Sequence, residues 1–267
     1  MRVLERARLD EPRGVSMIHL PLARASTVAW AAIVGAWLIL LTAEVTGYAR
    51  LLHHDALIEE GPPLWIGVLL FLLSWQVLIA AMMLPASLPT IRLVGVAMAR
   101  LTRPRLAEAA FLGAFALVWT IFGLLAFTGD FVLHHVVDAT PWLAARPWLI
   151  EAGVLGLAGA YQFAPSKVRS LAACRHPGGL LTAAATPQRD SFQIGMEHGL
   201  ACLGSGWALM LLMFAEGFGD LAWMGALTVL MAYEVTGRQG ERARRVAGFA
   251  LLIVGLAVLS GPMASGA

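Results

Sequence analysis

The sequence predicts an all-α protein, a polytopic transmembrane helix bundle of about seven spans with a cytoplasmic N-terminus and the C-terminus outside. Three observations lead to this fold class. Of the 267 residues, 59% are hydrophobic and 13% are charged, whereas about 25% are charged in an average soluble domain. Apolar stretches close to the roughly 20 residues that a spanning helix needs recur from Thr27 onward. Lys and Arg cluster in alternate connections between these stretches.

The predicted spans follow one another with short connections. The first is longer than the apolar core of a signal peptide, about 7–15 residues, so we expect it to remain in the protein. We expect the second helix to continue past Pro85 and Pro89 with a kink, because neighbouring helices compensate for the missing donors. The fourth is short and glycine-rich, which is typical of close packing. The approximate ranges are 26–48, 63–84, 108–128, 147–164, 192–214, 218–236 and 244–262.

Basic residues orient the chain in the membrane. With the N-terminus inside, 17 of the 19 Lys and Arg residues fall in cytoplasmic segments, and only Arg50 and Arg146 fall outside. Cytoplasmic connections carry such an excess, so the alternation supports the count of spans. We expect residues 1–25 to form a cytoplasmic basic segment and residues 26–263 to form a single transmembrane helical domain. The net charge of +2 and the absence of one basic patch argue against a nucleic-acid partner.

Polar and sulfur-containing residues gather near the predicted cytoplasmic ends of several spans. An ionisable group inside a span costs on the order of 2.5–3.5 kcal/mol, so those that persist are functional candidates. His198 and Cys202 are four apart and share a helix face, as two ligands of one metal ion would. Thiolate, thioether and imidazole together suit Cu(I), and Cys and His alone suit zinc. Methionine is also an ordinary packing residue. The candidate ligands of this cytoplasmic-side cluster are His198, Cys202, Cys174, His176, Met82, Met83 and Glu234, with Gln162 and Lys167 at similar depth.

A second group of candidate ligands falls on the predicted outer side. If residues 130–138 are helical, Asp130, His134 and Asp138 repeat every four residues along one face. Imidazole with carboxylate suits zinc or oxidised copper. The same residues would also fit a solvated connection without a ligand. The outer-side cluster consists of His53, His54, Asp130, His134, His135 and Asp138.

Common catalytic motifs are missing from the sequence. It contains no phosphate-binding Gly-x-x-x-x-Gly-Lys-Ser/Thr loop, no His-Glu-x-x-His zinc helix and no Gly-x-Ser-x-Gly nucleophile turn. Gly204, Ser205 and Gly206 lie inside an apolar helix, where small residues favour close helix packing. No catalytic residue is predicted, and copper or zinc is the expected cofactor class.

Three blocks of the sequence, Ala80 to Pro85, Gly159 to Pro177 and His198 to Met210, resemble a family of uncharacterised bacterial integral membrane proteins described as predicted metal-binding (domain of unknown function 2182). The first is Ala80 to Pro85, which is similar to the Ala-Met-Met-x-Pro signature of that family. The second runs from Gly159-Ala160-Tyr161-Gln162 through Lys167 to Cys174-Arg175-His176-Pro177. The third begins at His198-Gly199, includes Cys202, and ends at Trp207-Ala208-Leu209-Met210. Glu234 falls where the family commonly has an acid.

The resemblance covers roughly residues 63–262 and implies membership of that family and a location in the bacterial cytoplasmic (inner) membrane. The chain also departs from the family pattern. Ser170 stands where the family often carries the first cysteine of a Cys-x-x-x-Cys pair, and Ser205 and Gly206 replace its paired cysteines before Trp207. A thiolate-rich site therefore does not carry over to this sequence.

Three functions are compatible with these observations. The first is a membrane protein that binds or transports a transition metal at the cytoplasmic-side cluster, with the outer-side cluster as a loading or exit point. The second is an accessory or assembly subunit, in which small-residue helix faces bind a partner subunit or a second copy of the chain. The third is a metal-dependent membrane oxidoreductase built on the outer-side cluster. In all three functions the lipid bilayer is a partner. The candidate ligands favour metal binding or transport over the other two functions.

Overall fold

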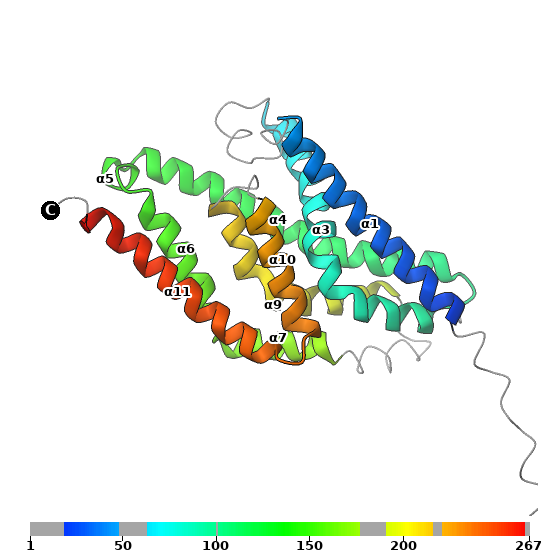
Figure 1. The fold of residues 1–267 in the computed structure, drawn as a ribbon. Coiled ribbons are helices and arrows are strands. Elements are labelled where there is room, and N and C mark those ends of the chain that lie inside the picture. The colour runs from blue at the N-terminus through cyan, green and yellow to red at the C-terminus, as the bar shows by residue number, and fades with distance from the viewer. Residues whose placement is uncertain (1–18, 48–62, 100, 177–190, 216–220, 265–267) are drawn as a thin grey trace, which may run out of the picture.

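The computed structural model describes residues 19–47, 63–99, 101–176, 191–215 and 221–264, and all regular secondary structure within these ranges is helical (Figure 1). The predicted all-α class is confirmed. In chain order the helices are α1 (His19–Val45), α3 (Leu64–Met98), α4 (Pro104–Asp138), α5 (Pro141–Ala144), α6 (Trp148–Tyr161), α7 (Pro165–Arg175), α9 (Ser191–Ala215), α10 (Leu221–Thr236) and α11 (Gly240–Ala264).

Four of the described helices are long and apolar enough to cross a membrane. They cover Thr27–Val45, Trp65–Met98, Pro104–Asp138 and Gly240–Ser260, and α6 and α10 are shorter apolar helices. Each of the seven predicted spans coincides with one helix, namely α1, α3, α4, α6, α9, α10 or α11. The long apolar helices indicate a multi-pass membrane protein, while seven crossings and their direction remain predictions.

Large apolar side chains cover the outer faces of the bundle. Val34 and Leu38 on α1, and Ile253 and Leu256 on α11, are all exposed. A contiguous apolar surface of this kind is rare on a soluble monomer. Lipid chains would cover these side chains at no cost, which agrees with the hydropathy of the helices.

The helices pack mainly in pairs around α9. In Figure 1, α1 lies along α3, and α6 lies along α11. Helix α9 contacts α4, α6 and α7, while α10 contacts α3 and α11. The middle of α9 is therefore surrounded by helices from distant parts of the sequence.

Helix α3 runs without a break through Pro85 and Pro89, as predicted. Proline has no N–H, so Pro85 leaves the carbonyl of Ala81 without its helical donor. The indole Nε1 of Trp37 on α1 donates to this oxygen at 3.2 Å. The neighbouring helix thus satisfies the freed carbonyl, which is how membrane helices tolerate internal proline.

Candidate metal site

A small buried cavity lies among α3, α7, α9 and α10. Its volume is ≈ 10 Å³, which is about the space of one water molecule. Soft and polar side chains reach it from all four helices. Its lining consists of Met83, Ala86, Ser87, Leu171, Cys174, His198, Cys202, Ser205, Gly206, Met231, Glu234 and Val235.

His198 is a buried imidazole without a hydrogen-bond partner among the described residues. The side chain is 2% exposed, and neither ring nitrogen is paired within that part of the chain. The ring stacks on Phe111 and Phe115 of α4, with centroid distances of 5.8 and 5.5 Å. Buried polar atoms are nearly always paired, so two free ring nitrogens need an explanation such as a ligand.

A glycine determines how closely α4 approaches this imidazole. Gly199 lies beside α4, and an added Cβ there would be only 3.0 Å from Val118 Cγ2. The missing side chain lets the two backbones come close. The phenyl rings of α4 therefore hold the His198 ring in place.

The two cysteines enter the cavity from different helices. Both are free thiols and both are buried, Cys174 on α7 and Cys202 on α9. Ser205 connects them, because its Oγ lies 3.9 Å from Cys174 Sγ and donates to the Cys202 carbonyl at 2.8 Å. Ser87 Oγ lies 3.9 Å from Cys202 Sγ. One hydroxyl thus lies beside each thiol.

Burial keeps the Cys174 thiol protonated at neutral pH. Desolvation raises the pKa of Cys174 to about 11, against the smaller opposite effects of Ser205 and Lys167. A metal ion binds the thiolate, so its binding would displace the proton. In the absence of a metal ion, the Cys174 thiol is therefore neutral.

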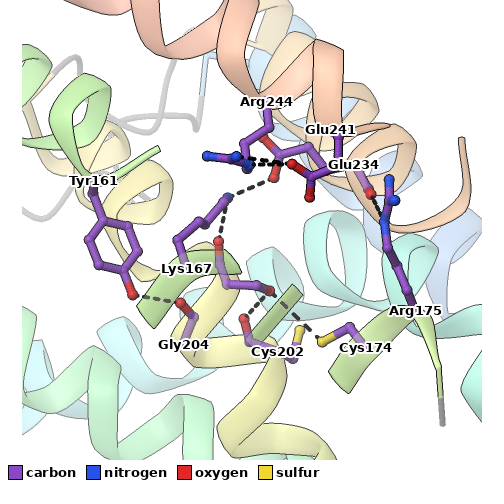
Figure 2. A network of polar contacts seen from close by, with 10 residues as sticks. Tyr161, Lys167, Cys174, Arg175, Cys202, Gly204, Glu234, Glu241 and Arg244 are labelled. Carbon is purple, nitrogen blue, oxygen red and sulfur yellow. Dashed lines mark hydrogen bonds and ion pairs between the residues drawn. The ribbon is translucent and has the colours of Figure 1, made fainter. Parts of the chain in front are cut away.

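A buried ion pair adjoins the cavity (Figure 2). Lys167 Nζ lies 2.6 Å from Glu234 Oε2 and donates to the Ser205 carbonyl at 2.5 Å. The two side chains are 1% and 2% exposed. Arg244 interacts electrostatically with both of them. Burial lowers the pKa of the Lys167 ammonium, and the neighbouring Glu234 carboxylate opposes this shift.

Two further side chains tie the helices around the cavity together. Tyr161 OH at the end of α6 donates to the Gly204 carbonyl of α9 at 2.7 Å. Arg175 Nε at the end of α7 donates to the Glu234 carbonyl of α10 at 2.7 Å (Figure 2). Directional bonds therefore link α6, α7, α9 and α10 next to the thiols.

The structure places five of the seven cytoplasmic-side candidates at this cavity, namely Met83, Cys174, His198, Cys202 and Glu234. Met82 is buried in the core and does not line the cavity. His176 lies at the C-terminal end of α7, exposed, with Nδ1 3.3 Å from the Ala172 carbonyl oxygen. Within the described ranges, no three His, Cys, Asp or Glu side chains form a ready metal site. Metal binding by the five remains a prediction.

Four of the six outer-side candidates, Asp130, His134, His135 and Asp138, lie at the C-terminal end of α4. The helix extends to Asp138, so the condition for a shared face is met. His134 Nδ1 lies 3.6 Å from Asp130 Oδ2 and 3.0 Å from the Asp130 carbonyl oxygen. His135 Nδ1 instead lies 2.9 Å from the Phe131 carbonyl oxygen. His53 and His54 lie outside the described residues.

Several cavity residues were not among the sequence candidates. Ser205 is three residues after Cys202, and Met231 is three before Glu234, so helical spacing from known candidates would have indicated both. Ser87 is four residues after Met83 and shares its face in the same way. Lys167 was noted only for its depth, and no sequence signal pairs it with Glu234.

One comparison with known proteins identifies a family. A family model described as PpoB2, copper chaperone, matches residues 72–258, which is more than half of the chain. The matched range includes every residue that lines the cavity. No curated protein and no solved structure matches the chain.

Proposed function

The chain belongs to the PpoB2 copper chaperone family, and from this premise we propose that it is a membrane protein that binds Cu(I) in the cavity among α3, α7, α9 and α10. The observation that supports this proposal is that thiol, thioether and unpaired imidazole side chains all line the same small cavity. Cys174, Cys202, His198 and Met83 are the proposed ligands. Soft sulfur ligands select Cu(I), and imidazole is a common partner for it.

This chain has fewer cysteines than the predicted metal-binding family that its sequence resembles, which fits a site with fewer thiolate ligands. Ser205 and Gly206 both line the cavity, at the positions where that pattern has paired cysteines. Their replacement leaves Cys174 and Cys202 as the thiols there. We propose membership of that predicted metal-binding family as well, with a site that relies on thioether and imidazole in place of the missing thiolates.

The proposed arrangement in the membrane places the cavity toward the cytoplasm. The chain would cross the bacterial inner membrane seven times, with residues 26–263 as one domain and the N-terminus inside. The excess of Lys and Arg in alternate connections supports this orientation. Lys167, Arg175 and Arg244 lie near the cavity, at the end of the bundle that would face the cytoplasm.

The outer-side cluster would then be a second, weaker metal contact on the opposite face. Asp130 and His134 interact along one face of α4, and Asp138 follows at the next turn. Imidazole and carboxylate are harder ligands than thiolate, so this cluster would hold oxidised copper or zinc better than Cu(I). Its proposed role is loading or exit of the ion.

Metal analysis of purified protein tests the proposal. The detergent-solubilised full chain is incubated anaerobically with Cu(I), desalted, and analysed for copper and zinc by mass spectrometry. We expect about one Cu(I) per chain, since the cavity has room for a single small occupant. Cys174→Ser, Cys202→Ser and His198→Phe should each weaken Cu(I) binding about tenfold or more, as loss of metal-site groups does elsewhere.

His176→Asn is the matched control, because this imidazole lies outside the cavity on the same helix as Cys174. It should bind copper as the unchanged chain does. Copper content that is equal in the unchanged chain and in all three cavity variants would contradict the proposed site.

A further inference from the structure

Helix α9 presents a third position in line with His198 and Cys202. Gly206 follows Cys202 by four residues, so the three positions occupy successive turns of one helix face. Gly206 is buried and lines the cavity, yet it contributes no side chain. The donor groups at this position come from neighbouring helices.

Two methionine sulfurs and an indole converge on Gly206. A Cβ built on Gly206 would lie 3.6 Å from Met231 Sδ, 3.7 Å from Trp119 Cη2 and 3.8 Å from Met83 Sδ. These are ordinary contact distances, so the sulfurs face the α9 backbone directly. Met83 comes from α3 and Met231 from α10, and both are almost fully buried.

Met83 and Met231 belong to the buried core, but unlike the other buried methionines that the structure describes they also line the cavity. Met82, Met98, Met210, Met213 and Met224 are also buried, and none of them lines it. Among the described methionines, Met83 and Met231 are the two that line the cavity together with Cys174, Cys202 and His198. Methionine has three rotatable bonds, so both sulfurs could move toward an ion without a change in the backbone.

The chemistry of thioether ligands distinguishes between metal ions. Thioether sulfur is soft and neutral, and it favours Cu(I), whereas zinc is satisfied by thiolate and imidazole. Neutral ligands also limit the charge that must be buried when two thiolates bind one monovalent ion.

We propose that Met231, together with Met83, forms a thioether half of the copper site around Gly206 and sets its preference for Cu(I) over Zn²⁺. This inference rests on the proposed function, because it concerns the same cavity. Cys174, Cys202 and His198 would supply the thiolate and imidazole ligands. The two methionine sulfurs would add soft, neutral ligands from α3 and α10.

Leucine substitutions test the preference, since Leu and Met have similar volumes and the exchange usually costs little stability. Cu(I) and Zn²⁺ affinities are measured in detergent by competition with chromophoric chelators. Met231→Leu and Met83→Leu should each weaken Cu(I) binding about tenfold. Zn²⁺ binding should stay unchanged in both. Met224→Leu is the matched control, because Met224 is buried on α10 two turns before Met231 and does not line the cavity.

X-ray absorption on selenomethionine-labelled protein loaded with Cu(I) tests direct bonding. A selenium atom bonded to copper should be present in the unchanged chain and in Met224→Leu, and absent in the Met83→Leu/Met231→Leu double variant. Folding of each variant is checked by gel filtration. Copper bound without selenium, with Cu(I) affinity unchanged in Met231→Leu and reduced in Cys202→Ser, would overturn this inference alone. A chain that binds no Cu(I) would overturn it together with the proposed function.

Discussion

Lys167 and Glu234 form the most costly side-chain arrangement described in this protein. Removing two charges from water costs several kcal/mol for each ion, and their attraction repays this only with close geometry and further hydrogen bonds. Both conditions are met, because the pair is 2.6 Å apart and Lys167 also donates to the Ser205 carbonyl. The pair adjoins the thiol cavity, so its charges contribute to the electric field there.

Removal of one partner should destabilise the protein more than removal of both. Lys167→Met leaves the Glu234 carboxylate buried without its cation, and we expect a loss of about 3–5 kcal/mol in the free energy of unfolding. The Lys167→Met/Glu234→Met double variant should recover part of this loss. Thermal and denaturant unfolding in detergent measures both changes.

Arg169→Met is the control for this experiment. Arg169 is an exposed cation on the same helix, and its loss should change the stability by less than about 0.5 kcal/mol. A Lys167→Met variant as stable as Arg169→Met would show that the buried pair contributes no stability.

The spacing of residues along one helix predicted correctly which side chains share a face. His198 and Cys202 are four apart, and the structure places both at one cavity. Spacing could not choose between Met82 and Met83, because adjacent residues point about 100° apart and the choice depends on which face α3 turns toward α9. Met231 is absent from the sequence candidates, although its spacing of three residues from Glu234 indicates a shared helix face.

Helices α6 and α11 pack closely along glycine. A Cβ added to Gly159 would lie 2.9 Å from Leu252 Cγ and 3.0 Å from the Gly248 carbonyl oxygen. Such distances are shorter than real Cβ contacts, so any side chain there must push the helices apart. The close packing predicted for the glycine-rich fourth span is therefore present at Gly159.

Valine substitutions at two glycines of α6 distinguish the cost of overpacking from the effect of valine on helix formation. Gly159→Val should lower the free energy of unfolding by about 1–3 kcal/mol, because overpacking forces the backbone to shift. Gly153→Val places the same residue on the same helix in open space, where no atom lies within 4 Å. It should cost little or nothing. Thermal unfolding in detergent compares the two, and equal losses would contradict the packing argument.

Hydropathy predicted the positions of the apolar helices, but not all of the residues at which they begin and end. Each of the seven predicted spans coincides with a helix, yet α4 begins four residues earlier than predicted and continues ten residues further, to Asp138. Hydropathy does not predict helix α7, because its sequence is polar and lies in the connection between the fourth and fifth predicted spans. Pro165 at its first turn is a recognised helix start. This helix is what carries Lys167 and Cys174 to α9.

At the scale of the whole molecule, the orientation rests on charge. The excess of Lys and Arg in alternate connections is a property of the sequence alone. Packing between helices supplies no direction across a membrane, so the structure adds the arrangement of the bundle and the location of the cavity. The direction of the chain needs an experiment in cells.

Reporter fusions test the direction of the last helix. Green fluorescent protein fused after Arg238 should fluoresce, because it would remain in the cytoplasm. Alkaline phosphatase fused after Ala267 should be active, because α11 would carry it across the membrane. The exchanged reporters at the two sites should both be silent. Fluorescence at both sites would show that α11 does not cross.

The hydrogen bonds from Tyr161 and Lys167 to consecutive carbonyls of α9 have a mechanical consequence. A shift of α9 by one residue means a screw motion of about 100° and 1.5 Å. Such a motion would break both bonds and turn His198 and Cys202 away from the cavity. These two bonds therefore fix the rotational register of α9, so that the helix face with His198 and Cys202 stays directed at the cavity and at the sulfur atoms of its neighbours.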